Sequence, residues 1–287
     1  MRIVDNIAAL RVHTSLTRTN KAIEKSTLRL SSGFRINSAG DDPAGFSISL
    51  QMRKQIGAMN MADRNTLDGT SLLQTADAAL QDVHDILQRI RELAVQASND
   101  TNSDFDRGVI QNEIFQLLEE IDDVTRKVEF NNIRLLNGET QNLRVQVGGR
   151  QHMSIAINIP SFHTMDDVMG LRWENPDYPT DPDAEPIIGL DVSTLQGAQD
   201  AIDLAQSASE RVSRQRAEIG AFINRFEYTS SSLQATIEAT SRSLSRVQDT
   251  DMAWEMMQLS INNVLNQAGM AIMAQVNARP QQILQLI

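Results

Sequence analysis

The sequence predicts a mainly α fold: a long antiparallel helical bundle or coiled coil with a small β-hairpin subdomain. From Leu195 to Val247, apolar or small residues recur at alternating steps of three and four, with no Pro between them. An unbroken helix of about fifty residues would be roughly 75–80 Å long at ~1.5 Å per residue. Aromatic residues make up only 4% of the 287 residues, which favours extended helix packing over a wide globular core. After Asn137-Gly138 the period changes to the two-residue alternation of strands.

Polar residues interrupt the long row from Leu195 to Val247. Ser209, Arg216, Ser230 and Thr240 occupy positions of this row, which we call its seam. Such residues weaken a simple dimeric zipper. We therefore expect this helix to pack inside a bundle, where its polar seam residues contact other helices.

The first predicted helix runs from Ala9 to Leu30 and ends at Ser31-Ser32-Gly33, because Gly can take the left-handed terminating conformation. Its seam is narrow: Ala9, Val12, Leu16, Thr19, Ile23, Ser26 and Leu30. A loop follows, in which Asp42 is the expected N-cap of the next helix and Pro43 its first residue.

The helix after Pro43 has the cleanest seam of the sequence. Its members are Leu73, Ala76, Leu80, Val83, Leu87, Ile90, Ala94 and Ala97, with a second row at Leu72, Ala79, Ile86 and Leu93. After a polar loop, Ser103 or Asp104 can cap a third helix. That helix carries Ile110, Ile114, Leu117, Ile121, Val124 and Val128, and we expect Glu119, Glu120, Asp122 and Asp123 to face largely outward. The short loop predicts an antiparallel pair.

Alternating residues predict one β-hairpin before Pro160. Its strands would contain Leu143, Val145 and Val147, then Met153, Ile155, Ile157 and Ile159, joined by a turn at Gly148-Gly149. From Ser161 to Pro186 no period is found, and Pro and acidic residues predict an irregular, solvated segment.

Beyond Val247, a joint is predicted at Asp249-Thr250-Asp251, followed by a last helix that ends before Pro280. Its seam would continue through Asp251, Trp254, Gln258, Ile261, Leu265, Ala268 and Ile272. The first and last helices both have thin seams, so each needs a partner, and the nearest candidate is the other. The methionines of the last helix, Met252, Met256, Met257, Met270 and Met273, are interpreted as core filling rather than as an adaptable binding surface, although both interpretations converge if the partner is another subunit.

Composition and motifs favour neither catalysis nor nucleic-acid binding. The net charge is -11 with dispersed basic residues, and the absence of Cys leaves no Cys-based zinc site. The four His residues lack ligand spacing, and Asp41-Asp42 is interpreted as a helix-capping pair rather than a metal or acid/base site. We expect no catalytic, cofactor or metal site. No membrane span is expected, and Asp5 and Asn6 argue against a classical signal peptide.

Several motifs closely resemble those of bacterial flagellins, and together they cover both ends and the helical core. They are RLSSGFRINSA from Arg29 to Ala39, QRIRELAVQ from Gln88 to Gln96, Phe130-Asn131-Asn132 with Leu135-Leu136-Asn137-Gly138, RVQDTDMA from Arg246 to Ala253, and QAGMAIMAQVN from Gln267 to Asn277. Gly40 and Pro43 depart from the pattern of many relatives, in the connector that in this family helps to switch filament handedness.

The resemblance implies a structural subunit that self-assembles into the helical flagellar filament for swimming motility, a short form with a reduced outer region. A hook–filament junction protein and a secreted adhesin or receptor ligand are the alternatives. The implied domains are 1–36 with 249–287 as paired terminal helices of an inner tube, 37–137 with 190–248 as the rod, and 138–189 as the outer segment.

The resemblance also implies partners and site residues. The partners are other copies of the chain, a flagellar type III export chaperone, hook-junction and cap proteins, and a host Toll-like receptor; the location is a secreted filament, either extracellular or periplasmic. Receptor recognition is implied for Arg89, Leu93 and Glu113. The residues expected in assembly or in the connector are Leu16, Ile23, Leu30, Arg35, Asn37, Asp41, Asp42, Asp249, Asp251, Ile261, Leu265 and Ile272.

Overall fold

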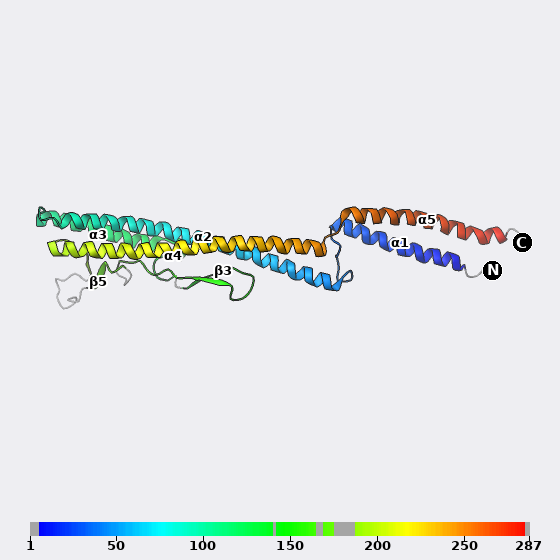
Figure 1. The fold of residues 1–287 in the computed structure, drawn as a ribbon, viewed down its shortest axis with the longest axis horizontal. Coiled ribbons are helices and arrows are strands. Elements are labelled where there is room, and N and C mark those ends of the chain that lie inside the picture. Colours follow the sequence, from blue (N-terminus) through cyan, green and yellow to red (C-terminus); the bar gives the residue numbers. More distant parts are fainter. Residues whose placement is uncertain (1–5, 140–141, 165–168, 175–186, 285–287) are drawn as a thin grey trace. The chain divides into compact units, whose positions relative to one another are not determined.

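A computed structural model describes residues 6–139, 142–164, 169–174 and 187–284 (Figure 1). Its helices are α1 (Ile7–Ser32), α2 (Pro43–Ala97), α3 (Asp104–Lys127), α4 (Leu195–Gln248) and α5 (Met252–Leu284). Its strands pair in antiparallel twos: β1 (Glu129–Phe130) with β2 (Ile133–Arg134), β3 (Leu143–Gln146) with β4 (Ser154–Ile157), and β5 (Arg172–Glu174) with β6 (Ile187–Gly189). The predicted mainly α class is confirmed.

The chain forms two compact units, and each is described by itself. One contains Met1–Gly57 and Thr236–Ile287, and the other contains Ala58–Ala235. In the second unit, α2 runs opposite to both α3 and α4 (Figure 1).

The core of the unit Ala58–Ala235 lies along the predicted seam of α2. All eight seam residues from Leu73 to Ala97 have no exposed surface, and seam residues of α4 face them, including Ala205, Val212 and Phe226. These seam predictions are confirmed. Ser103 caps α3, as one of the two predicted alternatives, and forms a capping box with Asp106.

Three of the four polar seam residues of α4 contact α2, as expected. Arg216 Nε donates to Asp77 Oδ1 at 2.9 Å, and Ser230 Oγ donates to the carboxylate of Asp63. Ser209 Oγ lies 3.3 Å from His84 Nδ1. A charge or hydroxyl that is half-buried between helices keeps its hydrogen bonds this way. The pairs also fix which residues of α2 and α4 lie opposite one another.

The predicted β-hairpin is confirmed as β3 and β4, with strands shorter than the alternation suggested. Val145 pairs with Ile155, and these residues pack with the helical core. Gly69 of α2 makes this possible, because a Cβ there would lie 3.0 Å from the Phe226 ring and 3.3 Å from Val145. The hairpin and α4 therefore meet α2 at one residue without a side chain.

Two strand pairs of the structure, β1–β2 and β5–β6, were not predicted from the sequence. Between β1 and β2, Asn131 and Asn132 have φ of 49° and 65°, which suits the tight two-residue turn of a hairpin. Strand β5 lies in the stretch from Ser161 to Pro186, so the prediction of an entirely irregular segment is wrong there. The rest of that prediction at 165–168 and 175–186 lies outside the described residues.

Asp122 faces inward, so the prediction that it faces outward is wrong. It is 2% exposed and accepts hydrogen bonds from Thr164 N and Thr164 Oγ1, both at 2.9 Å. Arg172 Nη1 lies 3.2 Å from its carboxylate, and His163 Nδ1 lies 3.3 Å away. Burying a carboxylate is costly unless such partners surround it. Asp122 therefore anchors the segment that leads into β5 to helix α3.

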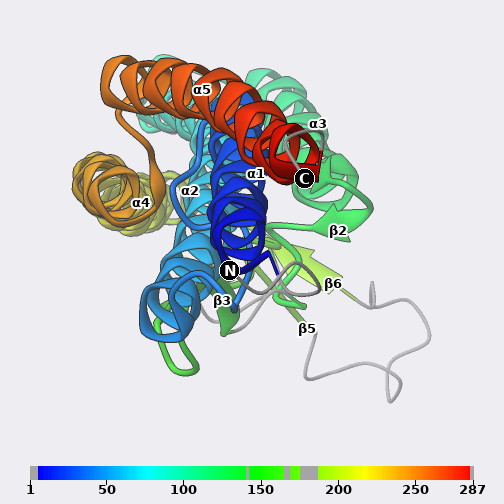
Figure 2. The ribbon, with the colours of Figure 1, turned by 90° about the vertical axis from the view of Figure 1, so that its right-hand side faces the viewer.

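In the other unit, α1 lies beside α5 (Figures 1 and 2). Helix α1 ends at Gly33, whose φ is 75° and whose N–H donates to Arg29 O, as predicted. The predicted joint is also confirmed, since α4 ends at Gln248 and α5 begins at Met252.

Helix α5 continues through Pro280 to Leu284, so the predicted end before Pro280 is wrong. Because Pro has no backbone N–H, it cannot donate to the carbonyl of Val276 four residues earlier. Asn6 Nδ2 lies 3.4 Å from that oxygen and donates to it instead. A side chain at the start of α1 thus compensates for the Pro in α5.

We expect Asp122→Ala to lower the free energy of unfolding by about 3 kcal/mol, because it leaves Arg172 buried without its carboxylate. Urea denaturation followed by circular dichroism measures this change. The control is Asp123→Ala, which removes an exposed pair with Lys127 and should cost less than about 0.5 kcal/mol. Equal shifts in the two variants would contradict the anchoring role.

Candidate assembly surface

The connector after α1 is joined to the end of α4 through the backbone. Phe34 and Asp249 form an antiparallel bridge, and Arg35 N donates to Gln248 O at 2.6 Å. Thr250 N donates to Gly33 O at 3.0 Å, and the Arg35 guanidinium reaches Val247 O at 2.8 Å. The motifs RLSSGFRINSA and RVQDTDMA, far apart in sequence, therefore meet.

Asp41 organises the loop that follows. Its Oδ2 accepts from Asn37 N at 3.3 Å and from Ser38 N at 3.2 Å, while Lys25 Nζ of α1 lies 2.7 Å from Oδ1. The Lys25 ammonium is the main cause that lowers the pKa of Asp41 from 3.8 to about 2, and the two N–H groups add to it. Asp41 therefore stabilises the conformation of this loop and attaches it to α1.

Two nearby carboxylates, Asp42 and Asp251, cap helices, and a third, Asp249, hydrogen-bonds to the end of α4. Asp42 Oδ1 accepts from Gly45 N at 3.0 Å, which confirms its prediction as the N-cap of α2. Asp251 Oδ1 accepts from Ala253 N at 2.9 Å and from Trp254 N at 3.1 Å, so it begins α5 in the same way. Asp249 accepts from the hydroxyl of Ser245 in the last turn of α4.

The predicted seam of α1 is the row that α5 partly covers. Leu16, Ile23 and Leu30 are half-buried in this row. At Gly269 of α5, a Cβ would lie 2.8 Å from Leu16 Cδ1, so the two helices approach closely there. Near the connector, Arg29 Nη1 lies 3.4 Å from the buried carboxylate of Glu255.

The row of α5 that is covered shares only Gln258 with the predicted seam. It consists of Glu255, Gln258, Leu259, Asn262, Asn266, Gly269, Met273 and Val276, and Asn266 hydrogen-bonds Asn20 of α1. We call the exposed residues Trp254, Ile261, Leu265 and Ile272 the outer row; they are between 46% and 54% exposed. Because α5 is apolar on almost every side, its hydrophobic period did not identify the side that α1 covers. The side that faces α1 is the more polar one.

Methionines surround the exposed part of α5. Met252, Met256, Met257 and Met270 are each about half exposed, so core filling within the subunit is wrong for these four. Met273 lies in the covered row, where that interpretation is consistent with its partial burial.

Arg89 and Glu113 meet on the surface between α2 and α3. Arg89 Nη2 lies 2.7 Å from Glu113 Oε1, and Glu92 Oε2 lies 3.4 Å from Arg89 Nη1. The Glu113 carboxylate raises the pKa of the Arg89 guanidinium. Leu93 is only 2% exposed and packs in the core. In this structure Leu93 supports the surface from beneath, and Arg89 and Glu113 present polar groups on it.

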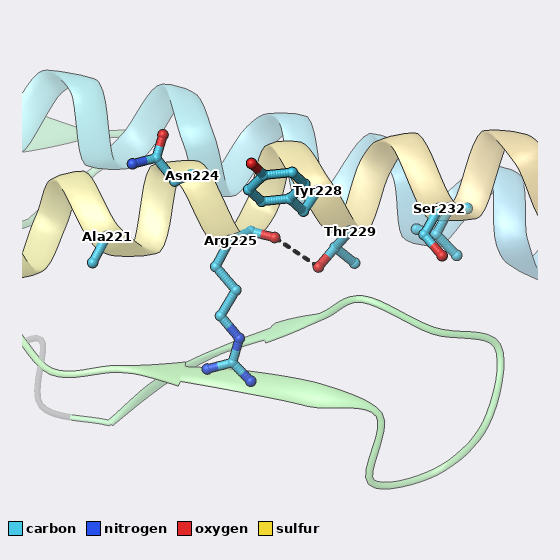
Figure 3. Close-up of a pocket in the computed structure, with 7 residues that line it drawn as sticks. Ala221, Asn224, Arg225, Tyr228, Thr229 and Ser232 are labelled. Carbon is cyan, nitrogen blue, oxygen red and sulfur yellow. Dashed lines mark hydrogen bonds between the residues drawn. The ribbon is translucent and has the colours of Figure 1, made fainter.

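The described residues offer no arrangement suited to catalysis. They contain no group of three or more His, Asp or Glu that could hold a metal ion. The groove shown in Figure 3 is lined by residues of α4 alone, among them Arg225 and Tyr228, and Tyr228 is 80% exposed. Within the same parts of the chain, every helix is too short or too polar to cross a membrane. Long amphipathic helices whose apolar residues stay half exposed, as on α5, are typical of structural proteins that self-associate.

Comparison with known proteins identifies the family within this class. Residues 3–141 match the bacterial flagellin N-terminal helical region, and residues 202–287 match the bacterial flagellin C-terminal helical region. The chain is 40% identical over 308 residues to a flagellin of Bacillus subtilis (strain 168), with all of both chains covered. It is 39% identical over 287 residues to a flagellin of Halalkalibacterium halodurans, again with both chains fully covered. The chain belongs to the bacterial flagellin family.

A solved structure accompanies these relatives. The crystal structure of Bacillus cereus flagellin is 26% identical, covers 62% of this chain and 94% of its own, and superposes with a TM-score of 0.47. The family assignment rests on the sequence relatives, and it confirms the resemblance drawn from the motifs.

We expect Asp41→Asn to destabilise the protein in a pH-dependent way. Because the folded pKa of about 2 lies below the ordinary value of 3.8, the charged carboxylate favours the folded state, fully so above about pH 5. The loss should be about 1–2 kcal/mol at pH 7, since solvent screens the half-exposed Lys25, and should vanish as the pH falls from 4 to 2.

Thermal melts of the wild type and of Asp41→Asn from pH 2 to pH 7, followed by circular dichroism, measure the difference in stability between them. Asp68→Asn, at an exposed site of α2, is the control and should change the melt little at any pH. A difference for Asp41→Asn that stays constant down to pH 2 would show that its charge is not what matters.

Proposed function

We propose that the chain is a structural subunit that self-assembles into the flagellar filament, and that the outer row of α5 is a contact between subunits. The observation that carries this proposal is the position of that row. Trp254, Ile261, Leu265 and Ile272 point away from α1, while the polar row of α5 faces it. The intramolecular pair therefore leaves the most apolar stripe of α5 uncovered.

A helix that is hydrophobic all round is normally buried all round. Helix α1 covers only one side of α5, so further helices must cover the remaining sides. Full burial of a large apolar side chain stabilises by about 1.5–3 kcal/mol, and half of that surface is still available on each residue of the outer row. Other copies of the chain supply such helices, and their binding stabilises the terminal helices by mass action.

The presence of two compact units supports a division of roles, although the unit that holds α1 and α5 extends to Gly57 and resumes at Thr236, beyond the bounds proposed here. We propose that residues 1–36 with 249–287 form the inner tube, that 37–137 with 190–248 form the rod, and that 138–189 form a reduced outer segment. The backbone bridge between Phe34 and Asp249 then lies where the first two parts join. The loop that Asp41 braces is the proposed connector whose geometry influences filament handedness.

The exposed apolar surface of α5 also bears on the steps before assembly. We propose that an export chaperone shields α5 before the chain leaves the cell, and that hook-junction and cap proteins contact the subunit during assembly. The filament itself is then secreted, either outside the cell or into a periplasm. The physical support is that an uncovered apolar helix invites non-specific association.

We expect the double variant Ile261→Gln with Leu265→Gln to raise the monomer concentration needed for polymerisation at least tenfold. Gln keeps the helix propensity but removes apolar surface that only the polymer buries. Sedimentation of filaments grown from seeds measures this concentration.

The matched control is Ile261→Leu with Leu265→Ile, which keeps volume and hydrophobicity and should polymerise normally. Circular dichroism of the monomers should agree for all three proteins. Normal polymerisation of the Gln variant would exclude the outer row as a subunit contact.

We further propose that a host Toll-like receptor binds the free subunit through contacts with Arg89 and Glu113. Both side chains are about half exposed and are held together by their ion pair, so a partner meets a preformed polar pair. Leu93 acts through the packing of the core beneath them.

We expect Arg89→Ala and Glu113→Ala each to reduce receptor activation about 10- to 100-fold, the range of interface residues with large contributions. Reporter cells that express the receptor, titrated with purified monomer, measure this loss. Arg242→Ala, which removes the exposed pair with Glu238 on α4, should leave the response unchanged. A full response from both test variants would contradict the proposal.

A further inference from the structure

Methionine is the only sulfur-containing residue of this chain, because it has no Cys and 12 Met. Four of them stand exposed on one helix. Met252, Met256, Met257 and Met270 of α5 are 47%, 53%, 53% and 53% exposed, whereas Met59 of α2 and Met169, in a turn before β5, are buried. Exposure governs how fast a thioether meets a dissolved oxidant.

The exposed methionines flank the outer row on the turns of α5. Met257 lies three residues after Trp254 and four before Ile261, so these side chains share one side of the helix. Met252 and Met256 are also four residues apart and lie on one side together. Any surface that covers α5 in a polymer therefore meets these thioethers.

We propose that Met252, Met256, Met257 and Met270 are oxidative modification sites of the free subunit, with hydrogen peroxide or a related hydroperoxide as the oxidant. The thioether sulfur attacks the terminal peroxide oxygen and the O–O bond breaks. The transferred oxygen stays on sulfur and gives up its proton to the other oxygen, which leaves as water from hydrogen peroxide or as an alcohol from an organic hydroperoxide. The sulfur is oxidised by two electrons to the sulfoxide, and the peroxide is reduced.

The consequence follows from the polarity of the sulfoxide, and it rests on the proposed assembly through α5. A sulfoxide oxygen is a strong acceptor, and burying it in an apolar contact without a donor is unfavourable. Oxidised subunits would thus be excluded from growing filaments, while subunits already assembled would shield their own thioethers. Because methionine sulfoxide reductases restore the thioether, the block is reversible.

The test treats purified full-length monomer with hydrogen peroxide, locates added oxygen by peptide mass spectrometry, and measures elongation from filament seeds. We expect oxidation at the four α5 methionines to be at least tenfold faster than at Met59 and Met169, with a tenfold or greater loss of elongation rate. Treatment with methionine sulfoxide reductases A and B should restore the rate.

Two variants separate α5 from other exposed thioethers. The fourfold variant M252L, M256L, M257L and M270L should keep its elongation rate within twofold after peroxide. The matched control Met61→Leu with Met153→Leu removes two equally exposed methionines of the other unit and should stay as sensitive as the wild type. If the fourfold variant fails to extend seeds before treatment, the reductase rescue of the wild type decides.

Equal peroxide sensitivity of the fourfold variant would overturn the proposal. It would also be overturned by wild-type protein that carries the α5 sulfoxides and elongates normally, or by α5 methionines that oxidise no faster than Met59. Untreated wild type that does not extend seeds would instead overturn the proposed assembly function, which the mass spectrometry does not depend on.

Discussion

Two paired helices can bury only one side of each other, and this constraint governs the half of the molecule that contains both chain ends. The exposed residues of α1 are mostly polar, with Ile7, Leu10 and Leu28 as large apolar exceptions. Helix α5 is apolar on several sides and gives α1 its most polar one, with Glu255, Asn262 and Asn266 in the contact. The subunit by itself therefore leaves α5 incompletely covered, and we propose that other copies of the chain cover it.

The rod helices satisfy the same constraint differently. Helix α2 has a wide apolar face, and α3, α4 and the β3–β4 hairpin cover it from several sides. Polar residues in the α4 seam find matching partners on α2, as Arg216 does with Asp77. Such pairs add little stability where they are half exposed. They do distinguish one alignment of α2 and α4 from alignments shifted by a heptad, which an apolar seam alone would tolerate.

Periodicity predicted the rod well because its helices have one clearly apolar side. The seams of α2 and α1 and the joint near Asp249 were all predicted from the spacing of apolar and polar residues along the chain. Prediction failed where spacing carries no information. Asp122 looked like one of four outward acids, and its burial depends on Thr164 and Arg172, which the chain brings from some 40–50 residues away. The covered side of α5 was missed because nearly all of its sides are apolar.

The candidate site was predictable in part. The caps at Asp42 and the end of α1 at Gly33 follow from local chemistry, and the connector motif was recognisable by resemblance. The meeting of Arg35 with Gln248 was not, because it is a backbone contact between segments more than two hundred residues apart. The short turn at Asn131-Asn132 did carry a local signal, since Asn tolerates positive φ.

The hydrogen bond from Asn6 to the carbonyl that Pro280 leaves free spans 270 residues of chain. Contacts of such separation carry a large loop-closure entropy unless the intervening chain is already ordered. The rod, whose helices are joined by shorter connections, can form first and bring the two ends together. The order of folding that follows places the α1–α5 pair last, so a chain that emerges gradually from any narrow passage would acquire its rod before its two ends can meet.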